Sequence, residues 1–166
     1  MDNFYEQLVT TQKTTVYSIA NGGTYAVGVL GVMMVGSALF IEGLLFIAIA
    51  VGMFFLKKKL YVEYEYDFTN GEIDVDKIIE MKSRKRILSF NVKDIELLAP
   101  LESDPVRDFG NKPEKVLKVY PTTSDAKQYV AMITGGENRV QLIFVPDEKL
   151  IELCYKYNPR AVKKFL

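Results

Sequence analysis

The sequence predicts an α+β protein in which an apolar helical hairpin precedes a seven-stranded β domain with a C-terminal amphipathic helix. Three observations carry this prediction. Apolar residues concentrate between Thr24 and Leu56, where Glu42 is the only charged side chain. From Leu60 onward, apolar and polar residues alternate with the period of two that β-strands require. After Pro146 the apolar spacing changes to that of a helix.

Composition and charge restrict the classes of function. The chain has 21 basic and 21 acidic residues and no net charge, which argues against nucleic-acid binding because a phosphate-binding surface needs a basic excess. The sequence contains no histidine, which excludes Ser-His-Asp and Cys-His catalysis and the histidine-containing zinc sites. The single cysteine, Cys154, lies on the apolar face of the predicted C-terminal helix and is expected to serve packing. We therefore expect no enzyme, no metal and no cofactor.

The apolar region is too long for one span and favours two. As one helix, Thr24 to Leu56 would measure about 50 Å, against a hydrocarbon core of about 30 Å. A hairpin fits if its first span covers about 16–39 and its second about 43–60. Its turn near 40–43 would then place Glu42 at the far interface. One long or re-entrant segment is the alternative.

The segment boundaries and the orientation follow from the charges at the hairpin ends. The chain divides into a polar N-terminal segment (1–14), a transmembrane hairpin (15–59) and a soluble domain (60–166). Lys57, Lys58 and Lys59 directly follow the second span, and such basic clusters mark the cytoplasmic side. We expect a multi-pass protein of the cell membrane, with both termini and the soluble domain in the cytoplasm.

Small residues recur at close spacing in both predicted spans. They are Ser18, Gly22, Ala26, Ala48 and Gly52. Such residues let helix backbones approach closely in lipid, either inside the hairpin or in a homo-oligomer. Membrane helices are also rich in glycine and alanine without any such contact, so the three readings stay open.

The soluble domain reads as four strands, a long loop, three strands and a helix. Leu60 to Phe68 alternates cleanly, and Asn70-Gly71 supplies a two-residue hairpin turn. The remaining strands are expected at 73–81, 88–92, 95–98, 115–120, 128–134 and 139–145, with a surface loop at 101–114 and a tight connection at 135–138. Asp147 is a fitting N-cap for the helix, which ends before Pro159.

This order resembles the pleckstrin-homology (PH) superfold, which implies two orthogonal antiparallel sheets closed at one end by a helix. More narrowly, the chain resembles small bacterial membrane proteins with a transmembrane hairpin followed by a PH-like domain. The segments that carry the resemblance are YEYDFTNGEIDVDKI, KRILSFNVKDIELL and VPDEKLIELCYKY. The expected fold class is thus α+β, with a PH-like seven-stranded sandwich or barrel and a C-terminal helix.

Two charged clusters are candidate sites. Lys82, Arg84, Lys85 and Arg86 form a basic turn that, with Lys57 to Lys59, is a candidate membrane-surface contact. A solvated turn is the simpler reading. Glu72, Asp74 and Asp76 fall on one face of a strand and lack the spacing of a calcium loop, so we expect an exposed acidic face.

Together these features predict a non-enzymatic, membrane-anchored PH-like interaction module. It would bind a protein partner or the inner-leaflet surface. The alternative is an accessory subunit of a membrane complex in which the hairpin is the functional part.

Overall fold

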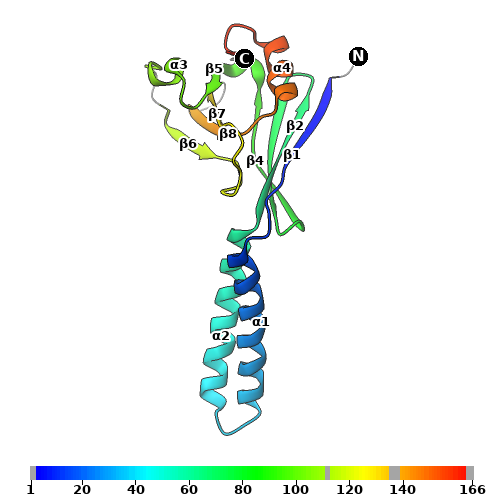
Figure 1. Ribbon diagram of the computed structural model, residues 1–166, viewed down its shortest axis with the longest axis vertical. Coiled ribbons are helices and arrows are strands. Elements are labelled where there is room, and N and C mark those ends of the chain that lie inside the picture. The colour runs from blue at the N-terminus through cyan, green and yellow to red at the C-terminus, as the bar shows by residue number, and fades with distance from the viewer. Residues whose placement is uncertain (1–2, 111–112, 135–138, 164–166) are drawn as a thin grey trace. The chain divides into compact units, whose positions relative to one another are not determined.

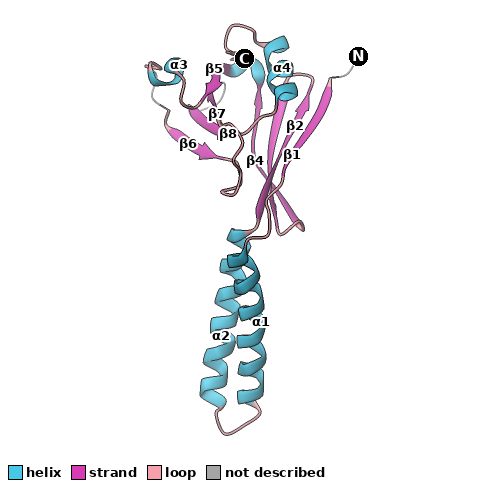
Figure 2. Cartoon of the chain, viewed as in Figure 1, coloured by secondary structure: helices cyan, strands magenta, loops and turns pink. Residues whose placement is uncertain are grey.

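The computed structural model describes residues 3–110, 113–134 and 139–163, which form two compact units. One unit is the helical hairpin, residues 11–62, and the other is a β domain that combines residues 1–10 with 63–166 (Figures 1 and 2). The predicted tight connection at 135–138 lies outside the described residues.

The hairpin consists of α1 (Thr15–Val35) and α2 (Phe40–Lys57), followed by the 3₁₀ turn η1 (Lys58–Leu60). The hydroxyl of Thr14 caps α1 by accepting a hydrogen bond from the Tyr17 amide at 3.1 Å. The turn occupies residues 36–39 and not 40–43 as predicted, because both helices are regular up to that point. Glu42 is exposed in the first turn of α2, where the helix dipole favours a carboxylate.

Two glycines set the close packing inside the hairpin. A Cβ atom at Gly43 would lie 2.6 Å from the Val35 backbone nitrogen, and one at Gly31 would lie 2.9 Å from a side-chain carbon of Ile47. In contrast, Cβ atoms at Gly22 and Gly52 would meet nothing within 4 Å. The helices therefore approach each other at Gly31 and Gly43, and not along the predicted row that contains Gly22.

The β domain contains two four-stranded sheets, with order β1-β2-β3-β4 in sheet 1 and β5-β7-β8-β6 in sheet 2. The strands are β1 (Phe4–Val9), β2 (Val62–Thr69), β3 (Glu72–Ile79), β4 (Ser83–Asn91), β5 (Ile95–Pro100), β6 (Lys115–Lys118), β7 (Tyr129–Ile133) and β8 (Val140–Phe144). Each of the seven predicted strands has a counterpart, and β1 is additional.

Strand β1 corrects the predicted division of the chain. It pairs antiparallel with β2, from Phe4 opposite Thr69 to Val9 opposite Tyr64. The first residues thus belong to the β domain and do not form a separate polar segment. The hairpin is inserted into the connection between two paired strands.

Sheet 2 departs from the all-antiparallel arrangement that the resemblance implied. Strand β6 pairs parallel with β8, so that Lys115 lies opposite Val140 and Lys118 opposite Ile143. The chain after β5 crosses to the far edge of the sheet before it returns through β7, which pairs antiparallel with β8.

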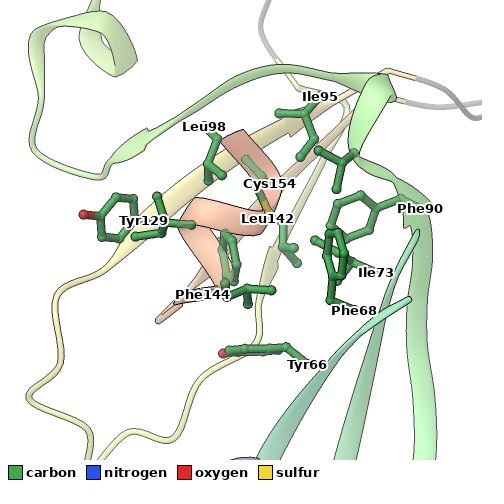
Figure 3. Close-up of a cluster of buried hydrophobic side chains, with 14 of the residues drawn as sticks. Tyr66, Phe68, Ile73, Phe90, Ile95, Leu98, Tyr129, Leu142, Phe144 and Cys154 are labelled. Carbon is green, nitrogen blue, oxygen red and sulfur yellow. The ribbon is translucent and has the colours of Figure 1, made fainter. Parts of the chain in front are cut away.

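The main core lies between the two sheets and under the last helix, α4 (Glu148–Tyr157). Figure 3 shows its composition, with large apolar side chains converging from both sheets around Cys154 of α4. Tyr66 and Phe144 pack edge to face with ring centres 5.5 Å apart. The buried Tyr66 hydroxyl donates to the Val119 carbonyl at 2.6 Å, which satisfies the polar atom in this core. The predicted packing position of Cys154 is confirmed.

The outer face of sheet 2 is covered as well. A short helix, α3 (Asp104–Arg107), lies in the predicted surface loop. From this segment Val106 and Phe109 pack against a second buried cluster that contains Val130 and Met132. Both faces of β7 are therefore buried, whereas the outer face of sheet 1 carries many charged groups.

Candidate functional site

The outer face of sheet 1 carries an unusual concentration of carboxylates. Tyr5 and Val9 of β1 pack against the main core, so the alternating residues Phe4, Glu6 and Leu8 project to the opposite side. Neighbouring strands add acidic and basic groups there. We call this set the carboxylate face, and it comprises Glu6, Glu65, Asp67, Asp74, Asp76, Arg84 and Arg86.

The carboxylates lie close together and several are buried. Carboxylate oxygens of Glu6, Glu65 and Asp67 lie within 4.8 Å of one another. Glu65 is 2% exposed and Asp76 3% exposed, although both lie on the side of the sheet that faces away from the core. The sequence predicted an exposed acidic face at Glu72, Asp74 and Asp76. Glu72 is exposed and Asp74 is partly buried, whereas Asp76 is buried and is in contact with the Arg86 guanidinium.

Arg84 and Arg86 are engaged in ion pairs within this face. The Arg84 guanidinium contacts Glu65 and lies 3.9 Å from Asp76. Arg86 lies 2.7 Å from an Asp74 oxygen and donates through its Nε to Asp76 at 3.0 Å. Two of the four residues of the predicted basic turn, Arg84 and Arg86, therefore form ion pairs with carboxylates of the same domain.

Charge crowding perturbs the acids of this face. Burial, a hydrogen bond with Glu6 and the charge of Asp67 raise the pKa of Glu65 to about 7, against the opposing effect of Arg84. Burial and the neighbouring Glu6 also raise the pKa of Asp67. At neutral pH the face therefore holds a carboxyl group that is partly protonated.

The two arginines do not satisfy all of the acidic oxygens. Among the described residues, the buried oxygens Glu65 Oε2, Asp67 Oδ1 and Asp74 Oδ1 have no hydrogen-bond donor. Glu65 Oε2 is in contact with the Arg84 guanidinium as an ion pair. Oxygen ligands of this kind suit Ca²⁺ or Mg²⁺, yet Arg84 already supplies positive charge at Glu65. The arrangement is an ion-pair network with excess acid.

The predicted lysines of the hairpin have two different environments. Lys57 is only 4% exposed and donates to the Asn21 side-chain oxygen at 2.5 Å. Its ammonium nitrogen lies 5.1 Å from the ring centre of Tyr25 and 5.0 Å from that of Phe54. Lys57 therefore does not fit the predicted surface role, because its charge is enclosed between the helices. Lys58 is half-buried and Lys59 is exposed.

The remaining basic residues, Lys82 and Lys85, are exposed at and after the turn between β3 and β4. The structure thus places the seven predicted residues in two separate units. In the β domain it brings Arg84 and Arg86 together with acidic residues, and not with one another as a cationic patch. Their position on the carboxylate face remains compatible with a role in binding.

Sequence reasoning missed Glu6 and the strand that carries it. The alternation of Phe4, Glu6 and Leu8 with apolar or amphipathic neighbours was the available signal. Tyr5 contributes a further contact, since its hydroxyl donates to the carboxylate of Asp147 at the start of α4. That bond is the main reason why the pKa of Tyr5 is raised to about 12.

Cys154 offers no nucleophile. It is 1% exposed within the main core, and burial raises the pKa of its thiol to about 12. A thiol in this environment stays protonated and unreactive at neutral pH.

Two packed sheets closed by a C-terminal helix, with charged groups gathered on one outer face, define a PH-like module. The comparison of families agrees with the fold over nearly the whole chain. Residues 1–164 match the family described as "Bacterial PH-like domain (DUF6106)", and the protein belongs to that family. No curated protein and no solved structure was found to match the sequence.

Proposed function

We propose that this protein is a non-enzymatic interaction module, anchored in the membrane by its hairpin, whose PH-like domain binds a protein partner in the cytoplasm. The observation that carries the anchor is the exposure of apolar surface on both helices. The candidate spans are Thr15–Val35 and Phe40–Leu60. In the most apolar 18-residue stretch of each, only 11% and 17% of the residues are buried. A core helix of a soluble protein would be mostly covered, whereas a lipid-facing helix leaves this surface to the bilayer.

Pairing of β1 with β2 supports two crossings over one. Val9 lies opposite Tyr64, so the chain enters and leaves the hairpin at neighbouring positions of one sheet. Both ends of the hairpin must then lie on the same side of the membrane, which requires an even number of spans. The basic residues at the end of α2 favour the cytoplasmic side.

The charges of the β domain favour a protein partner over the inner leaflet. Arg84 and Arg86 pair with carboxylates, and the carboxylate face retains an excess of acid that anionic lipids would repel. A protein segment bearing lysine or arginine complements this face. Phe4 and Leu8, which are 63% and 49% exposed, add apolar contact area beside it.

The first experiment determines topology. A reporter that is active only outside the cytoplasm is placed after Ala38, in the hairpin turn, and separately at the C-terminus. Activity at Ala38 alone, together with resistance of the protein to carbonate extraction, is the expected result. Activity at the C-terminus, or release of the protein by carbonate, would contradict the proposed anchor and orientation.

A photo-crosslinking residue at Leu8 then tests the partner. We expect a protein adduct that decreases at high salt, because screened charges contribute to the contact. The matched control is the same residue at Val116, which is 52% exposed on β6 and remote from the carboxylate face in the fold. Equal adducts at both positions, or adducts with lipid alone at Leu8, would contradict a protein partner at this face.

The enclosed Lys57 is the observation that favours the alternative, an accessory subunit that acts through its hairpin. Replacing residues 15–57 with an unrelated two-span hairpin separates the two functions. Retention of the crosslinked partner supports the anchor, and loss of the partner with intact insertion supports the alternative.

A further inference from the structure

The hairpin has an apolar groove along one side, between α1 and α2. The groove has a volume of about 520 Å³ and is lined by Thr24, Tyr25, Gly28 and Met33 of α1 and by Ala50 and Phe54 of α2, among others. Gly28 creates its floor because it has no side chain, and a Cβ atom there would lie 3.6 Å from that of Ala50. From Tyr25 to Met33 the groove follows about 12 Å of helix.

Polar ligands are disfavoured along the groove. Thr24 and Tyr25 carry its hydroxyl groups, and the Thr24 hydroxyl donates to the Ala20 carbonyl at 2.7 Å within α1. The ring of Tyr25 and the side chain of Met33, residues that are 61% and 68% exposed, contribute apolar walls. The groove therefore suits a hydrocarbon chain.

One end of the groove carries positive charge. The Lys58 ammonium nitrogen lies 4.4 Å from the ring centre of Phe54, and that of Lys57 lies 5.0 Å from the same ring. Because Phe54 is a groove residue, both charges lie at the end of the groove that is nearer to η1. Lys58 is accessible for direct contact, and the enclosed Lys57 adds to the local positive field.

We propose that this groove binds one acyl chain of an anionic phospholipid, whose phosphate is held at Lys58. The proposal rests on the proposed function, since it requires that the hairpin lie in a bilayer. A chain directed from Lys58 toward the turn would lie in the leaflet on the lysine side of the membrane. That leaflet is the cytoplasmic one in the orientation proposed above, and it is rich in anionic lipid.

A second copy of the chain is a weaker candidate for the groove. Copies inserted with the same orientation would bring their Lys57 to Lys59 segments to the same depth. Like charges at one depth disfavour that association, whereas they attract an anionic headgroup. Charge complementarity thus distinguishes the lipid from the homodimer.

The test measures lipid retention by the full-length protein with native mass spectrometry. The protein is reconstituted with phosphatidylglycerol and phosphatidylcholine of identical acyl chains, and carbonate extraction of the same preparation reports insertion. We expect preferential retention of one phosphatidylglycerol. Gly28→Leu should abolish the retention by filling the groove, and Gly52→Leu, where a new side chain meets open space, should leave it unchanged.

A charge variant keeps the test informative if Gly28→Leu perturbs the helices. Lys58→Gln should reduce the preference for phosphatidylglycerol about fivefold. Lys118→Gln, an equal charge change at an exposed position of β6, should not change it.

Intact insertion without headgroup preference, or retention in Gly28→Leu equal to that of Gly52→Leu, would overturn the proposal. A protein dimer that Gly28→Leu dissociates would overturn it in favour of a second copy. Failure of insertion itself would overturn the proposed function.

Discussion

Glu65 shows how a single side chain can carry an electrostatic cost inside an otherwise ordinary sheet. It is nearly inaccessible, it lies beside Glu6 and Asp67, and Arg84 only partly balances this charge. An acid whose pKa is raised on folding binds its proton more tightly in the native state. Its ionisation therefore destabilises the fold as the pH rises from about 4.5 to about 7.

The substitution Glu65→Gln tests this cost. At pH 5 the native carboxyl is protonated and the variant should have little advantage. At pH 7.5 the variant should gain about 2 kcal/mol of unfolding free energy relative to pH 5, because the unfolded carboxyl is already mostly ionised at pH 5 and the native one ionises only near pH 7. Denaturant unfolding at the two pH values measures it. Glu102→Gln, an exposed acid outside this face, is the control, and an equal pH response of both variants would contradict the prediction.

Gly71 occupies a position where adding even a single methyl group should lower the stability of the fold. Its φ of +95° lies in the region that favours glycine, and a Cβ atom there would lie 2.5 Å from the Tyr157 ring. Gly71→Ala should lower the free energy of unfolding by about 1–3 kcal/mol. Thermal denaturation compares it with Gly110→Ala, where nothing lies within 4 Å. Equal melting temperatures would show that Tyr157 moves aside freely.

At the scale of elements, α4 is tied to the N-terminal strand through one aspartate. Asp147 caps α4 by accepting the Leu150 amide hydrogen bond at 2.8 Å, and it also accepts the Tyr5 hydroxyl hydrogen bond. Gln7 adds two bonds, as it donates to the Val145 carbonyl and accepts from the Asp147 amide, each at 2.9 Å. The start of the helix and strand β1 thus stabilise each other.

Asp147→Ala should therefore remove more than a helix cap. We expect a loss of about 1–2 kcal/mol, at the upper end of capping effects because Tyr5 also loses its acceptor. Asp147→Asn keeps an acceptor oxygen and should recover most of the stability. Hydrogen exchange of α4 and β1 is the measurement, and protection lost in α4 alone would contradict the coupling.

The contact between α1 and α2 has its own test. Gly43→Ala places a methyl group against the backbone of α1 and should force the helices apart, at a cost of about 1–3 kcal/mol. Gly52→Ala is the matched control because its position is open. Thermal stability of the full protein in detergent, followed by helix content, measures the difference, and equivalent variants would mean that another contact holds the hairpin.

At the scale of the whole molecule, the β domain closes on itself without the hairpin. Because Val9 and Tyr64 are partners, an Asn-Gly turn between Thr10 and Glu63 should join β1 to β2 as an ordinary β-hairpin. This shortened chain should be water-soluble and folded. Residues 63–166 alone should aggregate, because β2 would become an exposed edge. Circular dichroism and size-exclusion chromatography distinguish the two, and a folded 63–166 fragment would show that β1 is dispensable.

The fold was predictable where local patterns coincide with it. Alternation in β2, the Asn70-Gly71 turn and the Asp147 cap each act over a few residues, and each is present in the structure. The parallel pairing of β6 depends on a long crossover that no local pattern encodes. Strand β1 was missed because its partner lies beyond the hairpin. The burial of Glu65 depends on Arg84, which becomes its neighbour only in the folded sheet.

The insertion of the hairpin between β1 and β2 also bears on how the protein is made. Tyr64 follows its partner Val9 by 55 residues. At 5–20 residues per second, the ribosome therefore synthesises Tyr64 about 3–11 s after Val9, and β1 has no partner strand during that time. Closing so long a segment as a free chain has an entropic cost, which a formed helical hairpin lowers by bringing its two ends together. With the membrane anchor proposed above, assembly of sheet 1 should therefore follow insertion, so that the β domain folds completely only on chains whose hairpin has entered the bilayer.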